Sequence, residues 1–363
     1  TFVWAMMAAL LSAALWVNLA TYFNAPVSTT HAIVGGVVGS GIAAAGVGVV
    51  DWQTMGAIAA SWVISPVLGG VVAAAFLAFI KINIIYRDDK IAAAKRWVPA
   101  LLAIMASSFA CYLVMKGLDN VWRPGVWTIL ALGVAIFAAT YAVLRPWVAR
   151  RAEGLENRNQ SLRVLFHPPL ICSAALLSFA HGANDVANAV GPLAAIYHSA
   201  ASSNVAAEVT IPLWVMMIGA AGISLGLFLF GPRLVRMVGE QITKMNPMRA
   251  YCVALSAAIT VIVASALGLP VSSTHIAVGA VFGVGFFREL YTRHSPRRRA
   301  YIAKQLPAGS RPKDDDEGDD ETPAPRKLVR RAHFVTILAA WVITVPASAL
   351  LGAAIYFALS LLG

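Results

Sequence analysis

Long apolar stretches alternate with short polar ones along the whole chain. Ten stretches are long enough to cross a hydrocarbon core about 30 Å thick as helices, and they cover residues 1–23, 28–50, 55–80, 97–116, 126–148, 168–198, 210–231, 250–267, 272–287 and 334–361. Spanning structures in lipid are helices or closed barrels, and continuous apolar runs of this length favour helices. The pattern therefore predicts an all-α integral membrane protein with about ten transmembrane helices.

Charged residues are few and unevenly placed. The chain is 59% hydrophobic and only 12% charged, whereas about a quarter of the residues are charged in soluble domains. Its net charge is +11, but 26 of the 28 Lys and Arg lie in four loops, at 81–97, 145–167, 232–249 and 288–333. Ten alternating spans place all four loops on one side, which the positive-inside rule assigns to the cytoplasm. The charge therefore indicates membrane orientation and not nucleic-acid binding.

The same pattern divides the chain into segments. These are a first-repeat remainder at 1–80, central spans with basic loops at 81–167, a second-repeat core at 168–290, a polar loop at 291–333 and a last helix at 334–363. The polar loop is rich in proline and carries an acidic run at 314–321 between basic clusters, which predicts a disordered cytoplasmic loop. A regulatory role for it is the alternative. The three cysteines lie in or beside apolar runs without ligand spacing, which argues against a disulfide framework or a metal site.

One acidic residue interrupts the middle of an apolar segment. Asp185 lies in the sequence His-Gly-Ala-Asn-Asp-Val-Ala-Asn, which begins at His181. Charged groups at membrane depth cost several kcal/mol and usually face a protein interior, an ion or a substrate path. Asn184 and Asn188 are four residues apart and share one side of a helical turn. Gly182 permits a helix break, and an ordinary loop between two helices is the simpler interpretation.

A short polar motif occurs twice. Residues 26–31 read Pro-Val-Ser-Thr-Thr-His, and residues 270–275 read Pro-Val-Ser-Ser-Thr-His. Glycines follow at matching offsets, and the run from Trp62 to Pro66 resembles the run from Trp341 to Pro346. By the orientation above, the first motif enters the membrane from the cytoplasm and the second from outside. The copies are therefore predicted to be inverted, as in secondary transporters, whose midplane sites use broken helices.

Each motif places hydroxyl groups at the start of a helix. Free backbone N–H groups and the helix dipole favour an anion there, and the hydroxyls would add donors. The candidate donors are Ser28, Thr29, Thr30, Ser272, Ser273 and Thr274. Two such helix starts facing each other would hold an anion without any Lys or Arg. The simpler interpretation is plain N-capping of two helices.

Together these motifs resemble the inorganic phosphate transporter family, which includes low-affinity phosphate permeases and type III sodium–phosphate cotransporters. The Gly-Ala-Asn-Asp-Val-Ala-Asn run at 182–188 is similar to one hallmark of that family, and the paired Pro-Val-Ser-x-Thr-His motifs are similar to the other. The resemblance covers nearly the whole chain. It implies a proton- or sodium-coupled symporter that holds phosphate between two inverted halves, with no enzyme activity and no cofactor beyond the coupling ion.

One feature departs from the family pattern. The family carries the Asn-Asp motif once per half, and this chain has it once. His181 precedes His275 by 94 residues, so the partner motif is expected at the same distance before His31, upstream of Thr1. We therefore expect a chain that lacks the first spans of the family fold.

The proposed site has a definite chemistry. An ionised Asp185 accepts hydrogen bonds, so it can receive the hydroxyl of phosphate, bind the coupling cation, or do both. Sulfate offers no such proton, which favours phosphate, and a sulfate permease of the same family is the alternative. Asn184 and Asn188 each carry an amide donor and a carbonyl ligand for Na⁺. Backbone carbonyls freed by a break at Gly182 would complete a cation site.

Three histidines lie at membrane depth or its margin. His181, His31 and His275 are candidate proton carriers, because the pKa of histidine lies near physiological pH. The alternative is that each is neutral and bonded to a backbone carbonyl.

Two other classes of protein fit parts of the sequence. An intramembrane hydrolase could pair His181 with Asp185, but hydrolysis makes no use of an inverted duplication. A passive anion channel would need only the anion gradient. The simplest cellular location is a bacterial inner membrane, and assembly as a homodimer is left open.

Overall fold

The computed structural model describes residues 1–23, 25, 27–117, 124–202, 204–205, 209–241, 245–305 and 331–362. In these ranges the regular structure is entirely helical. The elements are α1 (Phe2–Tyr22), α2 (Thr29–Ala45), α3 (Trp52–Ile80), α4 (Lys90–Tyr112), α5 (Val126–Arg151), α6 (Asn159–Ser202), α7 (Leu213–Gln241), α8 (Pro247–Ala266), α9 (Ser273–His294), α10 (Pro296–Gln305) and α11 (Arg331–Ser360). The prediction of an all-helical membrane protein is confirmed.

Among the described residues, eight helical segments are long and apolar enough to cross a membrane. They come from α1, α3, α4, α5, α6, α7, α8 and α11. The two other expected spans, 28–50 and 272–287, form α2 and α9, and α2 has only 17 residues. The number of spans and the inversion of the two copies stay predictions.

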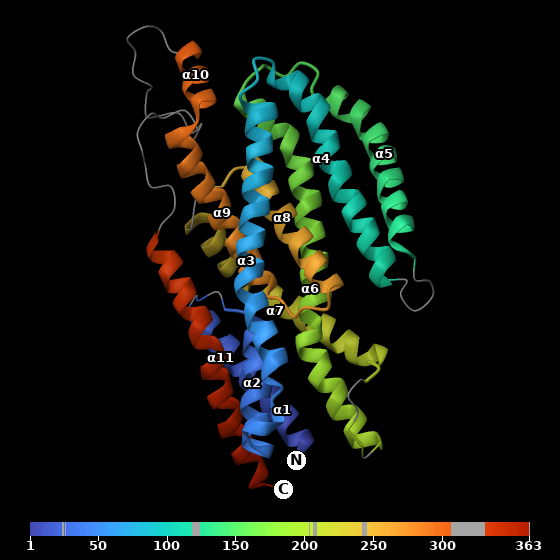
Figure 1. Cartoon of the computed structure of the whole chain (residues 1–363), viewed down its shortest axis with the longest axis vertical. Helices are drawn as coiled ribbons and strands as arrows, with labels where there is room; N and C mark the ends of the chain where they lie inside the picture. Colours follow the sequence, from blue (N-terminus) through green and yellow to red (C-terminus); the bar gives the residue numbers. More distant parts are fainter. Residues whose placement is uncertain are drawn as a thin grey trace.

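The two repeated motifs lie where two helical hairpins meet. The α1–α2 hairpin occupies the lower half of the molecule and the α8–α9 hairpin the upper half, with their turns in the middle (Figure 1). From there α2 runs toward one end and α9 toward the other. The two turns contact each other, since the Thr30 hydroxyl donates to the carbonyl oxygen of Val271. The side from which each motif enters the membrane stays a prediction.

Serine side chains fix where both short helices begin. The Ser28 hydroxyl accepts the backbone N–H of His31 at 3.1 Å, and the Ser272 hydroxyl accepts that of His275 at 3.2 Å. Each serine thereby satisfies one of the free N–H groups of a helix start. Both serines are buried, so these caps stabilise helix starts that water does not reach.

Each short helix packs against the long helix of the other repeat. Helix α2 packs against α11, and α9 packs against α3. Glycines allow these close crossings: a Cβ on Gly39 would overlap Ala349, and a Cβ on Gly283 would overlap Gly70. The matched contacts arise because the glycine pairs recur at the same offset in both copies. Because each repeat contributes a long helix that packs against the short helix of the other, the two repeats are held together by these contacts.

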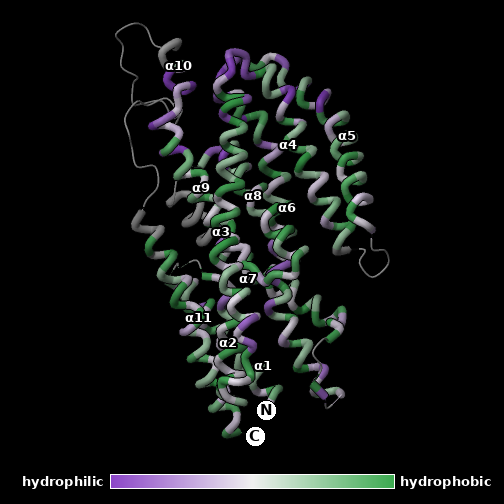
Figure 2. The backbone as a smooth tube through the Cα atoms, viewed as in Figure 1, coloured by the Kyte–Doolittle hydropathy of each residue, from purple (hydrophilic) through white to green (hydrophobic). Residues whose placement is uncertain are grey.

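The apolar core gathers around α8. Residues Tyr251, Leu255 and Val261 of α8 are almost fully buried, packed with side chains of α3, α4, α6 and α9. By contrast, α5 exposes apolar side chains such as Trp127 and Val134, as expected of a helix that faces lipid. Hydrophilic residues collect at the upper end, where the 81–89 and 152–158 turns and α10 lie (Figure 2). The described parts of the basic segments 81–97 and 145–167 thus include turns at one end of the molecule, and their cytoplasmic side stays a prediction.

One sequence prediction needs correction here. The 291–333 segment was expected to be disordered, but 291–294 continue α9 and 296–305 form α10; its described part is helical because the capped turn at Ser295 starts a new helix. Residues 306–330, including the acidic run, lie outside the described part of the chain. So does Pro26, which begins the first repeated motif.

Candidate functional site

Asp185 lies near the middle of α6, between the tips of the two hairpins. The residue is only 9% exposed, although it carries the only carboxylate deep in an apolar segment of the sequence. It therefore faces the protein interior and not lipid. A carboxylate in that position needs hydrogen-bond donors.

Those donors come from both repeated motifs. The hydroxyl of Thr29 donates to Asp185 Oδ2 at 3.2 Å. The hydroxyl of Ser273 lies 3.1 Å from each carboxylate oxygen. Thr29 and Ser273 hold equivalent places in the two motifs, as the second hydroxyl residue of each. Their side chains converge on one carboxylate, so the site spans both repeats.

Two neighbours on α6 complete the surroundings of the carboxylate. Asn184 Nδ2 donates to Asp185 Oδ1 at 2.9 Å. His181 Nε2 lies 3.3 Å from Asp185 Oδ2, and the histidine side chain is 42% exposed. The arrangement is rich in hydrogen-bond donors around a single carboxyl group.

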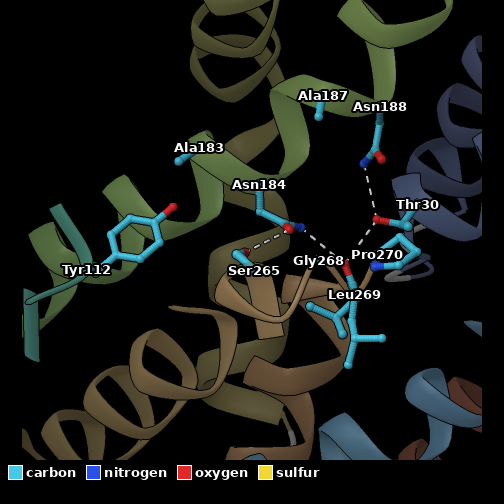
Figure 3. A pocket seen from close by; sticks show the side chains of 11 residues that line it. Thr30, Tyr112, Ala183, Asn184, Ala187, Asn188, Ser265, Gly268, Leu269 and Pro270 are labelled. Carbon is cyan, nitrogen blue, oxygen red and sulfur yellow. Dashed lines mark hydrogen bonds between the residues drawn. The ribbon is translucent and has the colours of Figure 1, made fainter. Parts of the chain in front are cut away.

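Asn184 connects this site to the α8–α9 turn (Figure 3). Its Nδ2 donates to the carbonyl oxygen of Val271 at 3.1 Å, and its Oδ1 accepts the hydroxyl of Ser265 at 3.2 Å. Sequence reasoning did not identify Ser265 or the Val271 carbonyl. Ser265 carried no signal, since a lone serine near a helix end is common, whereas Val271 lies inside the repeated motif.

Asn188 connects the site to the start of α2. Its Nδ2 donates to the hydroxyl oxygens of Thr29 and Thr30, at 3.2 Å and 3.1 Å. Thr30 in turn donates to the carbonyl oxygen of Val271 at 3.3 Å, as Figure 3 shows. Since Pro192 has no N–H, the backbone carbonyl of Asn188 lacks its helical partner. Side-chain and backbone oxygens therefore surround this position.

The predicted hydroxyl residues fall into distinct groups. Ser28 and Ser272 act as N-caps, so the simpler interpretation holds for them. Thr29, Thr30 and Ser273 face the asparagines and the carboxylate. Thr274, which matches Thr30, is half-buried, and its hydroxyl makes no hydrogen bond to a described residue. The N-capping interpretation therefore applies to the first serine of each motif, and the residues that follow it supply the side chains that face the site.

Two cavities adjoin the site and share Ala187 and Asn188. One, of about 330 Å³, is lined by Thr30, Asn184, Ser265, Tyr112 and the 268–271 turn. The other, of about 390 Å³, lies between α2 and the start of α3 and is mostly apolar. Asp51 lines the second cavity and caps α3, and the Thr54 hydroxyl holds the pKa of that carboxyl below its usual range. Asp51 is therefore anionic at neutral pH.

His31 and His275 point away from the carboxylate. Each follows the Asp185-binding hydroxyl residue by two positions, which is about 200° around a helix. Their rings instead contact each other, with centroids 4.3 Å apart. The structure therefore does not bring these two predicted coupling residues to Asp185, whereas it does bring His181.

The expected helix break at Gly182 is absent. Helix α6 runs without interruption from Asn159 to Ser202, because its flanking Ala, Val and Leu residues favour a helix and one glycine only weakens it. No carbonyl is freed there, and the nearest one is that of Asn188. Among the described residues, no group of three or more His, Cys, Asp or Glu side chains could hold a metal ion.

Comparison with known proteins yields consistent relatives. The model of the phosphate transporter family matches residues 1–352. A protein of Helicobacter pylori strain J99, named as a phosphate permease, is 44% identical over 99% of this chain and 75% of its own length. One of Pyrococcus abyssi, also named as a phosphate permease, is 35% identical over 79% of this chain and 70% of its own. A solved structure described as the sodium-dependent phosphate transporter superposes with a TM-score of 0.83 and 32% identity, covering 99% of this chain and 80% of that one.

Proposed function

This chain belongs to the phosphate transporter family, and from that premise we propose that it is a secondary-active symporter that couples phosphate to H⁺ or Na⁺ by alternating access. It is a multi-pass membrane protein and not an enzyme, and phosphate is its transported substrate. No cofactor beyond the coupling cation is needed. The proposed location is a bacterial inner membrane.

One observation carries the proposal: hydroxyls of two helix starts converge on a single buried carboxylate. Thr29 and Ser273 both donate to Asp185. A phosphate that approaches these donors meets the negative charge of the carboxylate, which repels it. A cation that neutralises Asp185 removes the repulsion and releases the hydroxyls to donate to the anion. Binding of the cation and of phosphate would therefore favour each other, which is the requirement for symport.

The protein groups around Asp185 suit either Na⁺ or H⁺ as the coupling ion. Oxygen atoms of Asp185, Asn184 and Asn188 with the Val271 carbonyl form the hard donor set that suits Na⁺. His181 beside Asp185 offers a route for a proton. The structural relative is named as sodium-dependent, and this favours Na⁺. Because Asn188 borders both cavities, phosphate bound beside it could leave through either one.

The test is uptake of labelled phosphate by purified protein in liposomes. A symporter accumulates phosphate above its external concentration when a Na⁺ or H⁺ gradient is imposed, and the gradient that drives it identifies the coupling ion. The control is the same liposomes with equal Na⁺ and pH on both sides, which should only equilibrate. Uptake that never exceeds equilibration under either gradient would indicate a passive channel and overturn the proposal.

A further inference from the structure

A tyrosine from the central spans lines the cavity of about 330 Å³ beside the site. Tyr112 is the last residue of α4 and is 9% exposed. It lies at one end of the cavity and Thr30 at the other, with Asn184 and Ser265 between them (Figure 3). The Tyr112 hydroxyl points toward α6, in the direction of Ala183. The function proposed above gives this hydroxyl no role.

Aromatic packing fixes where Tyr112 lies. Phe109, one turn earlier on α4, contacts Phe179 of α6 with ring centroids 5.0 Å apart. Because Phe179 precedes the Asn-Asp motif on the same helix, this contact holds the end of α4 beside that motif. A phenylalanine at position 112 would fill the same space, so packing does not require the hydroxyl. A buried tyrosine hydroxyl normally has a hydrogen-bond partner, and polar groups at membrane depth usually mark a substrate or ion path.

The lining of the cavity suits an anion that is held by neutral donors. Hydroxyl and amide groups both donate hydrogen bonds. A volume of about 330 Å³ is roughly ten times the share of one water molecule in the liquid, which leaves room for a phosphate ion and several waters. The polar side chains that the structure describes in this lining are all uncharged, and they are Thr30, Tyr112, Asn184, Asn188 and Ser265.

Asn184 connects the cavity to the carboxylate. It lines the cavity, while its Nδ2 donates to Asp185 Oδ1 at 2.9 Å. The Ser265 hydroxyl donates to Asn184 Oδ1 at 3.2 Å and holds the amide in this orientation. Asp185 itself lies outside the cavity wall. A phosphate ion in the cavity can therefore lie close to a cation at Asp185 without contacting the carboxylate.

We propose that Tyr112 is a further phosphate-binding residue, whose hydroxyl donates to a phosphate oxygen at the end of the cavity opposite Thr30. The inference rests on the proposed function, because it takes phosphate as the ion that fills the cavity. Thr30 and Asn188 then bind the ion from one end and Tyr112 binds it from the other. Bound phosphate thereby connects α4 to the site that the two repeated motifs form.

The test is equilibrium binding of labelled phosphate to the full chain in nanodiscs, at a fixed Na⁺ concentration and a fixed pH. Tyr112→Phe keeps the ring and removes only the hydroxyl. Loss of a hydrogen bond to a charged group corresponds to roughly a tenfold or larger loss of affinity, so the Kd for phosphate should rise by that factor. The melting temperature without phosphate should stay the same, because the ring still packs in its place.

The matched control is Tyr141→Phe on α5, whose ring stacks on that of Phe137 and does not line the cavity. Its Kd for phosphate should equal that of the original protein. A Kd for Tyr112→Phe within about threefold of the original, or an equal rise for both variants, would overturn the inference.

A second measurement keeps the hydroxyl in place. Fluorotyrosine introduced at position 112 should change its fluorine chemical shift when phosphate is added, whereas fluorotyrosine at position 141 should not. An unchanged resonance at position 112 with saturating phosphate would overturn the inference, even if Tyr112→Phe did not fold. Because binding needs no ion gradient, these outcomes are distinct from a failure to accumulate phosphate, which would count against the proposed function instead.

Discussion

At the scale of single residues, position within a motif decides what each hydroxyl does. Ser28 and Ser272 cap their helices, whereas Thr29 and Ser273, one residue later, turn toward Asp185. A step of one residue rotates a side chain by about 100° around a helix, which accounts for the division. The repeated motif therefore combines a structural residue with a ligand-facing residue.

Thr29 allows the ligand role to be tested by a matched pair of changes. Thr29→Val keeps the shape and removes the hydroxyl, while Thr29→Ser keeps the hydroxyl. A hydrogen bond to a charged group contributes about 1.5 to 3 kcal/mol, so Thr29→Val should raise the KM for phosphate roughly tenfold or more. Thr29→Ser should stay within about threefold of the original protein. Equal KM values for the two variants in liposome uptake would rule out a role for this hydroxyl.

At the scale of helices, the apolar runs predicted correctly which segments are helical, but they did not predict where in the molecule each helix begins. All ten runs form helices, because a long apolar segment in lipid has no other way to satisfy its backbone. The sequence did not reveal that α2 and α9 start in the middle of the molecule, since a hairpin and a pair of full spans leave nearly the same apolar pattern. The predicted helix break at Gly182 was wrong, because glycine permits a break without requiring one.

The crossing of α9 and α3 depends on Gly283. A Cβ there would overlap the backbone of Gly70, and overpacking of this kind costs about 1 to 3 kcal/mol. Gly283→Ala should therefore lower the melting temperature of the purified protein in detergent. Gly222→Ala on α7 is the control, because a Cβ at Gly222 meets no atom within 4 Å. If both variants melt at the same temperature as the original, the close crossing does not contribute to stability.

At the scale of the whole molecule, the described basic turns and the α1–α2 hairpin lie toward opposite ends. The 81–89 and 152–158 turns and α10 lie at one end (Figure 2), and α1 and α2 lie in the other half (Figure 1). The charge pattern alone predicted this polarity. The charge pattern could not predict that α2 packs against α11 and α9 against α3. If each short helix packed instead against the long helix of its own repeat, the apolar faces would be equally buried.

The polarity can be checked with two engineered cysteines in a cysteine-free background. Glu153→Cys lies in the turn after α5, and Gly125→Cys lies just before α5. A membrane-impermeant maleimide should label position 125 in intact cells and position 153 only after the membrane is opened. The reverse labelling would invert the orientation and refute the cytoplasmic assignment of the basic loops.

The carboxylate between the two hairpin tips remains the centre of the account. The most direct measurement is gradient-driven phosphate uptake by liposomes that contain the Asp185→Asn variant, with Glu153→Gln as a control for a carboxylate outside the site. The amide keeps the shape and removes the charge that the coupling cation neutralises. The account predicts that Asp185→Asn abolishes accumulation above equilibrium in protein that is still folded, while Glu153→Gln accumulates normally. Undiminished accumulation by Asp185→Asn would contradict it.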